Sequence, residues 1–207
     1  MRSAVVLVGG AATRANGQEK YFFTYEGKTF ISRLIESLSR EVDEIVLVAR
    51  DPAQCARFDH IHGVRCMSDI RKGIGPIGGL HAGAEAAKGD LLFVAACDMP
   101  CINPDVVARL FELIDGYDAA IPCWNREMYE PLHAVYRRSA LLAYLVGHNS
   151  LSLRDMVQNL RVTYVPVDEL RRYDPALRTF TNINRLEDLQ RFNHNPAGDP
   201  DRRTVQR

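Results

Sequence analysis

The fold of this chain is decided near its amino terminus by the stretch Val5-Val6-Leu7-Val8-Gly9-Gly10-Ala11-Ala12-Thr13-Arg14-Ala15-Asn16-Gly17-Gln18-Glu19-Lys20. An apolar run typical of a β-strand breaks into a loop of glycines and small residues that also carries two cations. In an α/β protein such a strand delivers its loop to the carboxyl edge of a sheet. Glycine N–H groups can approach an anion there, and the cations can neutralise it. The stretch therefore predicts a phosphate-binding loop with the candidate contacts Leu7, Gly9, Gly10, Arg14 and Lys20.

The loop matches neither of the two common phosphate signatures. A P-loop requires Ser or Thr after its lysine, but Lys20 is followed by Tyr21. A dinucleotide fingerprint separates its first two glycines, but Gly9 and Gly10 are adjacent. An ordinary tight turn with two solvated surface charges would show the same pattern, so the rest of the chain has to decide.

Length and charge narrow the class of protein. At 207 residues the chain is expected to form one domain over residues 1–192, followed by a polar, disordered tail over 193–207. The 26 basic and 26 acidic residues cancel, which argues against nonspecific nucleic-acid binding and against attachment to acidic membranes. No apolar run approaches the roughly 18 residues of a membrane span, and no signal peptide is recognisable. We therefore expect a cytoplasmic protein.

The cysteines and histidines do not predict a metal or disulfide framework. The five cysteines are odd in number and scattered, and most are expected to be small buried side chains: Cys55, Cys66, Cys97, Cys101 and Cys123. The six histidines show no ligand spacing. His133 lies in an apolar run and is predicted to be a core residue rather than a catalyst.

Apolar runs alternate with helical patterns along the chain, which predicts an α/β fold. We expect a mainly parallel, Rossmann-like central sheet with helices on both faces and a small antiparallel addition. The expected strands are residues 3–8, 44–49, 64–67, 91–96, 119–122, 131–136 and 161–167, of which 131–136 is the antiparallel candidate. The expected helices are residues 30–38, 80–87, 139–146, 151–160 and 187–192, and one that Asn103 caps and Pro104 begins.

Two further strand ends carry residues suited to a nucleotide. Asp69 is followed by a glycine-rich loop containing Gly75, Pro76, Gly78 and Gly79, which can read a planar base through main-chain groups. A plain turn with a locally capping aspartate is the alternative. Asp98 follows the most apolar strand, where it can bind Mg²⁺ together with phosphate oxygens, and its alternative is a helix cap.

A late segment adds two amides. Asn182 and Asn184 alternate in an extended stretch, so both can point to one side and bind a second substrate. Asn184 is equally suited to cap the last helix, with Glu187 completing a capping box.

Taken together, these motifs resemble the molybdenum cofactor guanylyltransferases of the MobA type. The resemblance rests on Gly9-Gly10, Arg14, Lys20 and the runs Gly75-Pro76-Ile77-Gly78-Gly79, Cys97-Asp98-Met99-Pro100, Glu130-Pro131-Leu132 and Thr181-Asn182-Ile183-Asn184. It implies GMP transfer from Mg²⁺-bound GTP to the phosphate of a molybdenum or tungsten pterin cofactor. It further implies a triphosphate loop at Gly9, Gly10, Arg14 and Lys20, a guanine and ribose region at Asp69 and residues 75–79, the magnesium ligand Asp98, and Asn182 and Asn184 near the pterin. Arg14, Lys20 and Asp98 are thus the expected catalytic residues.

The chain departs from this family's pattern at two places in the loop, where Ala15-Asn16 replaces Met-Gly and Glu19 replaces Asp. Two other functions stay open. One is a related transferase that uses CTP, or an acceptor such as phospholactate, cobinamide phosphate or a sugar phosphate. The other is a GTP-binding partner protein without catalysis. Oxidoreductases that receive the cofactor, or other proteins of its biosynthesis, are the expected protein partners.

Overall fold

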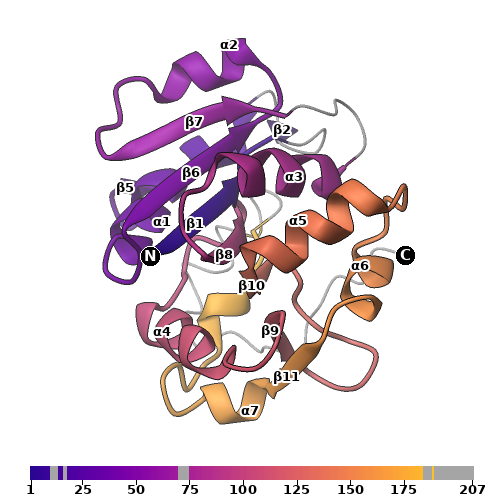
Figure 1. The fold of residues 1–207 in the computed structure, drawn as a ribbon. Helices are drawn as coiled ribbons and strands as arrows, with labels where there is room; N and C mark the ends of the chain where they lie inside the picture. The colour runs from indigo at the N-terminus through magenta and orange to yellow at the C-terminus, as the bar shows by residue number, and fades with distance from the viewer. Residues whose placement is uncertain (10–13, 16–17, 70–74, 184–187, 189–207) are drawn as a thin grey trace.

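The computed structural model describes residues 1–9, 14–15, 18–69, 75–183 and 188 of the chain (Figure 1). Most of the helix predicted over 187–192 and the tail predicted over 193–207 lie outside these residues, and the domain boundary at residue 192 stays a prediction. None of the helices in the described part is both long and apolar enough to cross a membrane.

A seven-stranded sheet forms the centre of the molecule, in the order β11-β9-β10-β8-β1-β6-β7. Its strands are β1 (Arg2–Leu7), β6 (Glu44–Ala49), β7 (Val64–Ser68), β8 (Leu91–Ala96), β9 (Ala119–Cys123), β10 (His133–Arg137) and β11 (Val162–Pro166). All neighbouring pairs are parallel except the two that β10 makes with β8 and β9. The predicted sheet, including its antiparallel member near residues 131–136, is confirmed.

Helices cover both faces of this sheet (Figure 1). They are α1 (Phe30–Leu38), α2 (Pro52–Cys55), α3 (Pro76–Ala86), α4 (Pro104–Leu113), α5 (Arg138–Gly147), α6 (Leu153–Gln158) and α7 (Val167–Leu170). The side chains of β1, and of Val8 directly after it, alternate between the two faces of the sheet, as in any β-strand. Ala4, Val6 and Val8 pack in the core beneath α1, α4 and α7, whereas Val5 and Leu7 pack beneath α3, α5 and α6.

Short elements make up the rest of the secondary structure in the described residues. The hairpin of β2 (Arg14–Ala15) and β3 (Gln18–Glu19) precedes η1 (Lys20–Phe22), and the hairpin of β4 (Thr24–Tyr25) and β5 (Lys28–Thr29) leads into α1. The remaining turns of 3₁₀ helix are η2 (Ala56–Phe58) and η3 (Arg178–Phe180). The predicted start of α4 is confirmed, because the Asn103 side chain accepts hydrogen bonds from the N–H groups of Asp105 and Val106.

The prediction that residues 76–79 belong to a loop is wrong. Helix α3 begins at Pro76, whose ring suits the first helical position, and Gly75 precedes it with a φ of 73°. The glycines inside α3 permit close packing rather than a free loop. A Cβ on Gly79 would lie 3.0 Å from Leu7 Cδ2, and one on Gly83 would lie 2.3 Å from Val5 Cγ1. The helix can therefore approach β1 only because these positions carry no side chain.

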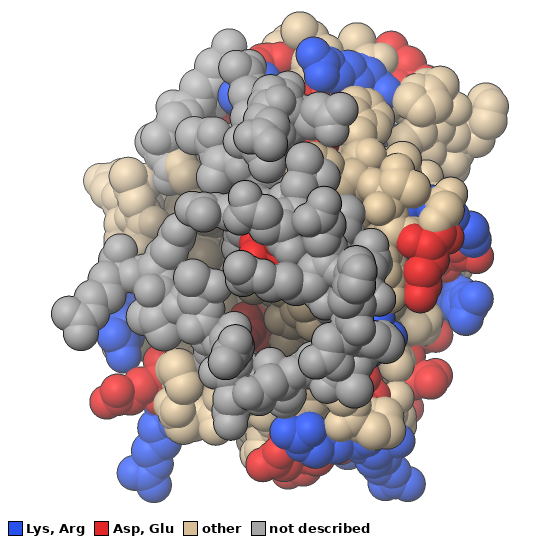
Figure 2. All heavy atoms as spheres, turned by 180° about the vertical axis from the view of Figure 1, so that it is seen from behind, with Lys and Arg blue, Asp and Glu red and all other residues tan. Residues whose placement is uncertain are grey.

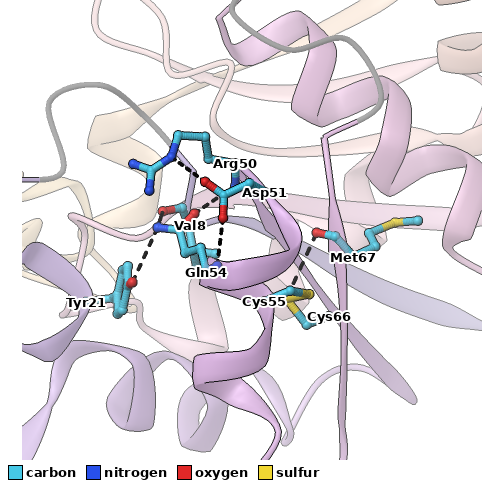
Figure 3. The surroundings of a disulfide bond; sticks show 8 residues. All are labelled: Val8, Tyr21, Arg50, Asp51, Gln54, Cys55, Cys66 and Met67. Atoms are coloured by element: carbon cyan, nitrogen blue, oxygen red, sulfur yellow. Dashed lines mark hydrogen bonds and ion pairs between the residues drawn. A yellow bond between two sulfur atoms is a disulfide. The ribbon is translucent and has the colours of Figure 1, made fainter.

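The expectation of no disulfide is also wrong, because Cys55 and Cys66 are bonded (Figure 3). They lie at the end of α2 and in β7, and their Cα atoms are 5.6 Å apart. Sequence spacing contained no signal for this pair, because the fold alone places α2 beside β7. Cys97 is buried, as predicted for most of the cysteines.

Candidate active site

The carboxyl ends of β7, β6, β1 and β8 meet at one rim of the sheet. Leu7 is in register with Val48 of β6 and with Ala96 of β8. Hydrogen bonds continue past the strands, from Gly9 N to the Val48 carbonyl at 3.0 Å, from Asp69 N to that of Ala49 at 2.7 Å, and from Cys97 N to that of Leu7 at 3.2 Å. The ladder thus brings the first loop, Asp69 and the Asp98 turn to a common edge, as the sequence predicted.

Gly9 is where the first loop leaves β1, and its backbone lies directly against that of β6. A Cβ at this position would lie 2.5 Å from the Arg50 amide nitrogen and 2.9 Å from the carbonyl carbon of Ala49. Real Cβ atoms essentially never come so close to main chain. The glycine is therefore required by the approach of two strand ends, a reason separate from any contact with phosphate.

Asp98 lies in the turn that follows β8 and is partly buried. Its main-chain carbonyl accepts a hydrogen bond of 2.8 Å from Ile183 N, 85 positions further along the chain. The Ile183 side chain is fully buried with Phe23, Tyr25 and Phe30. This anchor holds the segment around the exposed Asn182 beside the Asp98 turn, so two motifs that are distant in sequence share the rim.

A buried histidine supports the same segment. His133 is fully buried, as predicted for a core residue, and its Nε2 shares a hydrogen bond of 3.1 Å with Thr179 Oγ1. The Thr179 hydroxyl also accepts from Asn103 N at 3.1 Å. Burial lowers the pKa of His133 from 6.5 to about 3, because a charged imidazole would lose its solvation. The ring therefore stays neutral and acts as structure rather than as a proton carrier.

This burial predicts a pH-dependent stability. The unfolded chain takes up a proton on His133 below pH 6.5 while the folded chain does so only near pH 3, so stability falls as the pH drops through that window. The slope is about 1.4 kcal/mol per pH unit. Urea unfolding between pH 7 and pH 4.5 should show a shallower slope for His133→Gln. A control at an exposed position, His62→Gln, should keep the wild-type slope, and equal slopes for all three proteins would contradict the assignment.

Of the other predicted site residues, some are described with their side chains, some only by their backbone, and some lie outside the described residues. Gly75 and Pro76 are exposed at the start of α3, whereas Gly78 and Gly79 are buried in its first turn. For Arg14 and Lys20 the backbone positions are described, in β2 and η1. Gly10, Asn184 and residues 70–74 lie outside the described residues.

The fold and motifs agree with a known family. A family model described as a MobA-like NTP transferase domain matches residues 4–164. The chain belongs to this family. A relative in Methanosarcina mazei, named "Probable molybdenum cofactor guanylyltransferase", is 41% identical over 199 residues, which cover 91% of this chain and 88% of the relative. The resemblance seen in the sequence is thereby confirmed, and with it a nucleotidyltransferase enzyme.

Solved structures agree with this membership. The molybdopterin-guanine dinucleotide biosynthesis protein A from Archaeoglobus fulgidus has a TM-score of 0.75 and 34% identity, covering 92% of this chain and 96% of that one. A 4-diphosphocytidyl-2C-methyl-D-erythritol synthase from Anaerococcus prevotii has a TM-score of 0.69 at 13% identity, with 96% of each chain covered. At that identity the second likeness shows the fold alone.

The donor atoms of this MobA-like transferase fit a magnesium ion at Asp98. The described residues contain no group of three or more His, Cys, Asp or Glu side chains that could enclose a metal. Mg²⁺ needs no such group, because it is usually held by one or two carboxylates with substrate phosphates and water. The Asp98 carboxylate, in the turn after β8 at the rim of the sheet, is a donor of that kind.

The structure also places a pocket around part of the Glu130-Pro131-Leu132 run and adds residues that the sequence did not single out. A pocket of about 410 Å³ is lined by residues 127–131 and Arg154. Glu130 accepts a 2.8 Å hydrogen bond from Trp124 Nε1, and the Trp124 ring packs on Phe180 of η3. Because η3 leads directly to Asn182, the pocket lies on the same side of the site as the segment around Asn182. Arg154 gave no sequence signal, since its helix reads as an ordinary surface helix.

Charges are mixed on the face of the molecule shown in Figure 2. Where residues are described there, Lys and Arg side chains lie among Asp and Glu side chains, without a broad patch of one sign.

Proposed function

We propose that this protein transfers the GMP group of GTP to the terminal phosphate of a molybdenum or tungsten pterin cofactor and releases pyrophosphate. The observation that carries the proposal is the meeting of Gly9, Asp69, Asp98 and the Asn182 segment at one rim of the sheet. Donor and acceptor groups of the reaction are assigned to opposite sides of that rim. The product would pass to oxidoreductases that use the dinucleotide cofactor.

On the donor side, we assign the triphosphate to the first loop. The main-chain N–H group at Gly10 and the cations Arg14 and Lys20 would bind its oxygens. Gly9, whose own N–H donates to the Val48 carbonyl, would contribute by placing the start of the loop. Asp69 and the start of α3 at Gly75 and Pro76 would bind the ribose and guanine. Gly79, buried in α3, would act by letting the helix approach Leu7, and thus by shaping the floor of the nucleotide site rather than by touching the base. Gly78 is buried beside it in the same turn.

On the acceptor side, we assign the pterin phosphate to the late segment with Asn182 and Asn184, and the pterin itself to the pocket lined by residues 127–131 and Arg154. Amide groups at Asn182 and Asn184 can donate to phosphate oxygens. A guanidinium such as that of Arg154 can pair with an anion, and a carboxylate such as Glu127 can accept from the N–H groups of a pterin ring.

For this transfer the protein mainly has to align the attacking phosphate with the α-phosphorus and to neutralise the negative charge of the two substrates. The attacking phosphate monoester is largely dianionic at neutral pH, because its second pKa is near 6, and it needs no general base. One of its oxygens forms a bond to the α-phosphorus while the bond from that phosphorus to the leaving pyrophosphate breaks. Mg²⁺ bound at Asp98 would supply charge neutralisation at the phosphates. Arg14 and Lys20 would reduce the repulsion between the two anions and stabilise pyrophosphate as it leaves.

Replacing Lys20 tests the donor side. Lys20→Ala should weaken binding of Mg²⁺–GTP by about tenfold to a hundredfold, because a cation at the triphosphate is lost. Calorimetric titration of the variant with a non-hydrolysable GTP analogue measures this directly. Lys28→Ala is a suitable control, since Lys28 of β5 pairs with Glu36 in the second half of α1. Unchanged affinity in Lys20→Ala would remove the residue from the triphosphate site.

The activity itself is tested by pyrophosphate release. Purified enzyme is offered the pterin cofactor with GTP, CTP or ATP in parallel, and release is expected with GTP. Release with CTP alone, or only with another phosphorylated acceptor, would indicate the related transferase instead. GTP binding without release in any combination would indicate a non-catalytic partner protein.

A further inference from the structure

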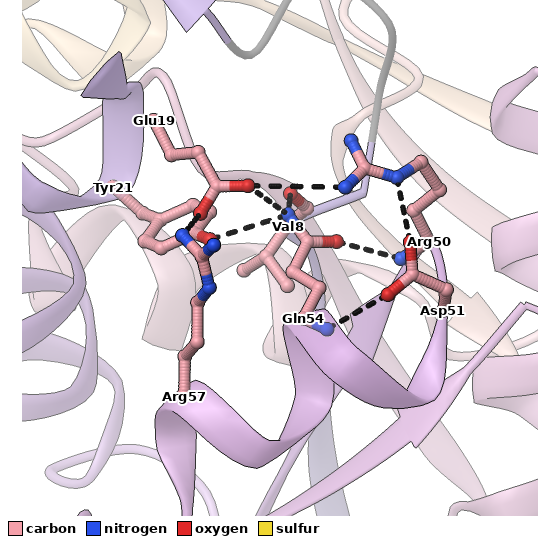
Figure 4. Close-up of polar contacts among 7 residues, drawn as sticks. All are labelled: Val8, Glu19, Tyr21, Arg50, Asp51, Gln54 and Arg57. Atoms are coloured by element: carbon pink, nitrogen blue, oxygen red, sulfur yellow. Dashed lines mark hydrogen bonds and ion pairs between the residues drawn. The ribbon is translucent and has the colours of Figure 1, made fainter. Parts of the chain in front are cut away.

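One buried side chain connects both ends of the first loop. Gln54 of α2 is 2% exposed, and its Nε2 lies 3.3 Å from the Val8 carbonyl before the loop and 3.3 Å from the Tyr21 hydroxyl after it (Figure 4). Its Oε1 accepts a 2.7 Å hydrogen bond from Arg50 N. Gln54 thus bridges the end of β1, the end of β6 and the return of the loop.

Glu19, the residue directly before Lys20, belongs to the same network. Its side chain is only 6% exposed, and its Oε2 accepts a 2.6 Å ion-paired hydrogen bond from Arg57 of η2. Its Oε1 lies 3.5 Å from Gln54 Nε2 and 3.9 Å from the Arg50 guanidinium. A buried carboxylate is costly unless it is paired, so these contacts fix where β3 ends.

The loop needs such an anchor because its own hairpin is small. β2 and β3 pair over only two residues each, Arg14 with Glu19 and Ala15 with Gln18. A two-stranded ribbon of that size has little stability of its own. The anchoring element is itself well held, because Asp51 caps α2 and the Cys55–Cys66 disulfide ties its end to β7 (Figure 3).

We propose that Glu19 and Gln54, with Arg57 acting through Glu19, are positioning residues that set the geometry of the triphosphate loop and the starting point of Lys20. The inference rests on the proposed function, since it presumes that the loop receives a triphosphate. Long-range contacts from α2 and η2, rather than the loop's own hairpin, determine the affinity for the donor substrate. Loss of the network should therefore weaken triphosphate binding by more than it weakens the fold.

A matched ion pair in the same chain supplies the control. Arg65 of β7 pairs with Glu44 at the amino end of β6, away from the rim. The two pairs are alike in burial, with side-chain exposures of 55% and 6% for Arg57–Glu19 and of 48% and 9% for Arg65–Glu44. Arg57→Ala and Arg65→Ala therefore delete similar ion pairs at opposite ends of the sheet.

The experiment compares Arg57→Ala, Glu19→Gln, Gln54→Leu and the double variant Glu19→Gln/Arg57→Ala with Arg65→Ala. Each is measured for thermal unfolding, for affinity to Mg²⁺–GTP and to inorganic tripolyphosphate, and for the KM of both substrates. We expect the loop variants to bind both anions about tenfold more weakly and to raise the KM of GTP but not that of the acceptor. Arg65→Ala should change affinity by less than about twofold. The double variant should be no weaker than Arg57→Ala, because Arg57 acts through Glu19.

The outcomes separate the two proposals. Anion affinities in the loop variants that match Arg65→Ala would overturn the positioning role, whatever their melting temperatures. Should Gln54→Leu fail to fold, the near-isosteric Glu19→Gln decides. A wild-type protein that binds tripolyphosphate but transfers no GMP would refute the proposed function, while the comparison of variants still tests the positioning role. A wild-type protein that binds neither anion would refute both.

Discussion

Asp98→Asn is expected to lower the turnover number by about a thousandfold, equivalent to about 4 kcal/mol of transition-state stabilisation. Asparagine keeps the size of the side chain but removes the charge with which a carboxylate holds Mg²⁺ beside phosphates. The backbone of the turn should be undisturbed, because its anchor is the main-chain bond from Ile183 N to the Asp98 carbonyl. Pyrophosphate release at saturating GTP and acceptor measures the effect.

Two controls separate a metal role from damage to the fold. Asp105→Asn changes an exposed acid in the first turn of α4, a few residues further on, and should keep nearly full activity. The melting temperature of Asp98→Asn should stay within a few degrees of wild type, and its residual activity should need more magnesium. Normal turnover with an unchanged magnesium requirement would remove Asp98 from the metal site.

Gly9→Ala is expected to abolish most activity for a different reason. The added methyl would lie 2.5 Å from Arg50 N and 2.9 Å from the Ala49 carbonyl carbon, so the main chain itself has to move. Overpacking of this kind costs about 1–3 kcal/mol of stability. A displacement of about 1 Å at a catalytic loop can cost a hundredfold in rate, and we expect a loss of that order.

Gly147→Ala is the matched control, because a Cβ at the last residue of α5 would meet nothing within 4 Å. That variant should be as stable as wild type or more so, since alanine favours a helix over glycine. Chemical unfolding and pyrophosphate release on both variants give the comparison. A Gly9→Ala protein with wild-type stability and rate would show that the strand ends can separate without consequence.

Residues whose role follows from local pattern could be predicted from the sequence. Short apolar runs such as 45–49 and 91–96 indicate buried strands, and Asn103-Pro104 combines two independent helix-start preferences. The position of Asp98 at the rim follows in turn, because carboxyl ends of parallel strands meet at one edge. His133 was also predictable as a core residue from its apolar neighbours.

Residues whose role depends on distant partners could not be predicted in this way. No local pattern points to a contact among Glu19, Gln54 and Arg57, yet Gln54 contacts Val8 across 46 positions and Arg57 contacts Glu19 across 38. The glycines at the start of α3 indicated a loop, because a single sequence does not distinguish a glycine in a loop from a glycine that lets a helix pack closely. The Cys55–Cys66 bond has the same origin, since their pairing depends on where α2 lies.

The sequence by itself thus determined the α/β class, the order of the strands along the chain and the presence of acids, amides and glycines at their ends. These features follow from short-range patterns of burial and capping, which depend on neighbouring residues only. Tertiary structure alone decided which strands became neighbours, how Ile183 came to bind the Asp98 turn, and how α2 came to hold the first loop. These depend on contacts between residues tens of positions apart. The energy of such contacts arises only when the whole sheet has assembled and water has been excluded from the groups involved.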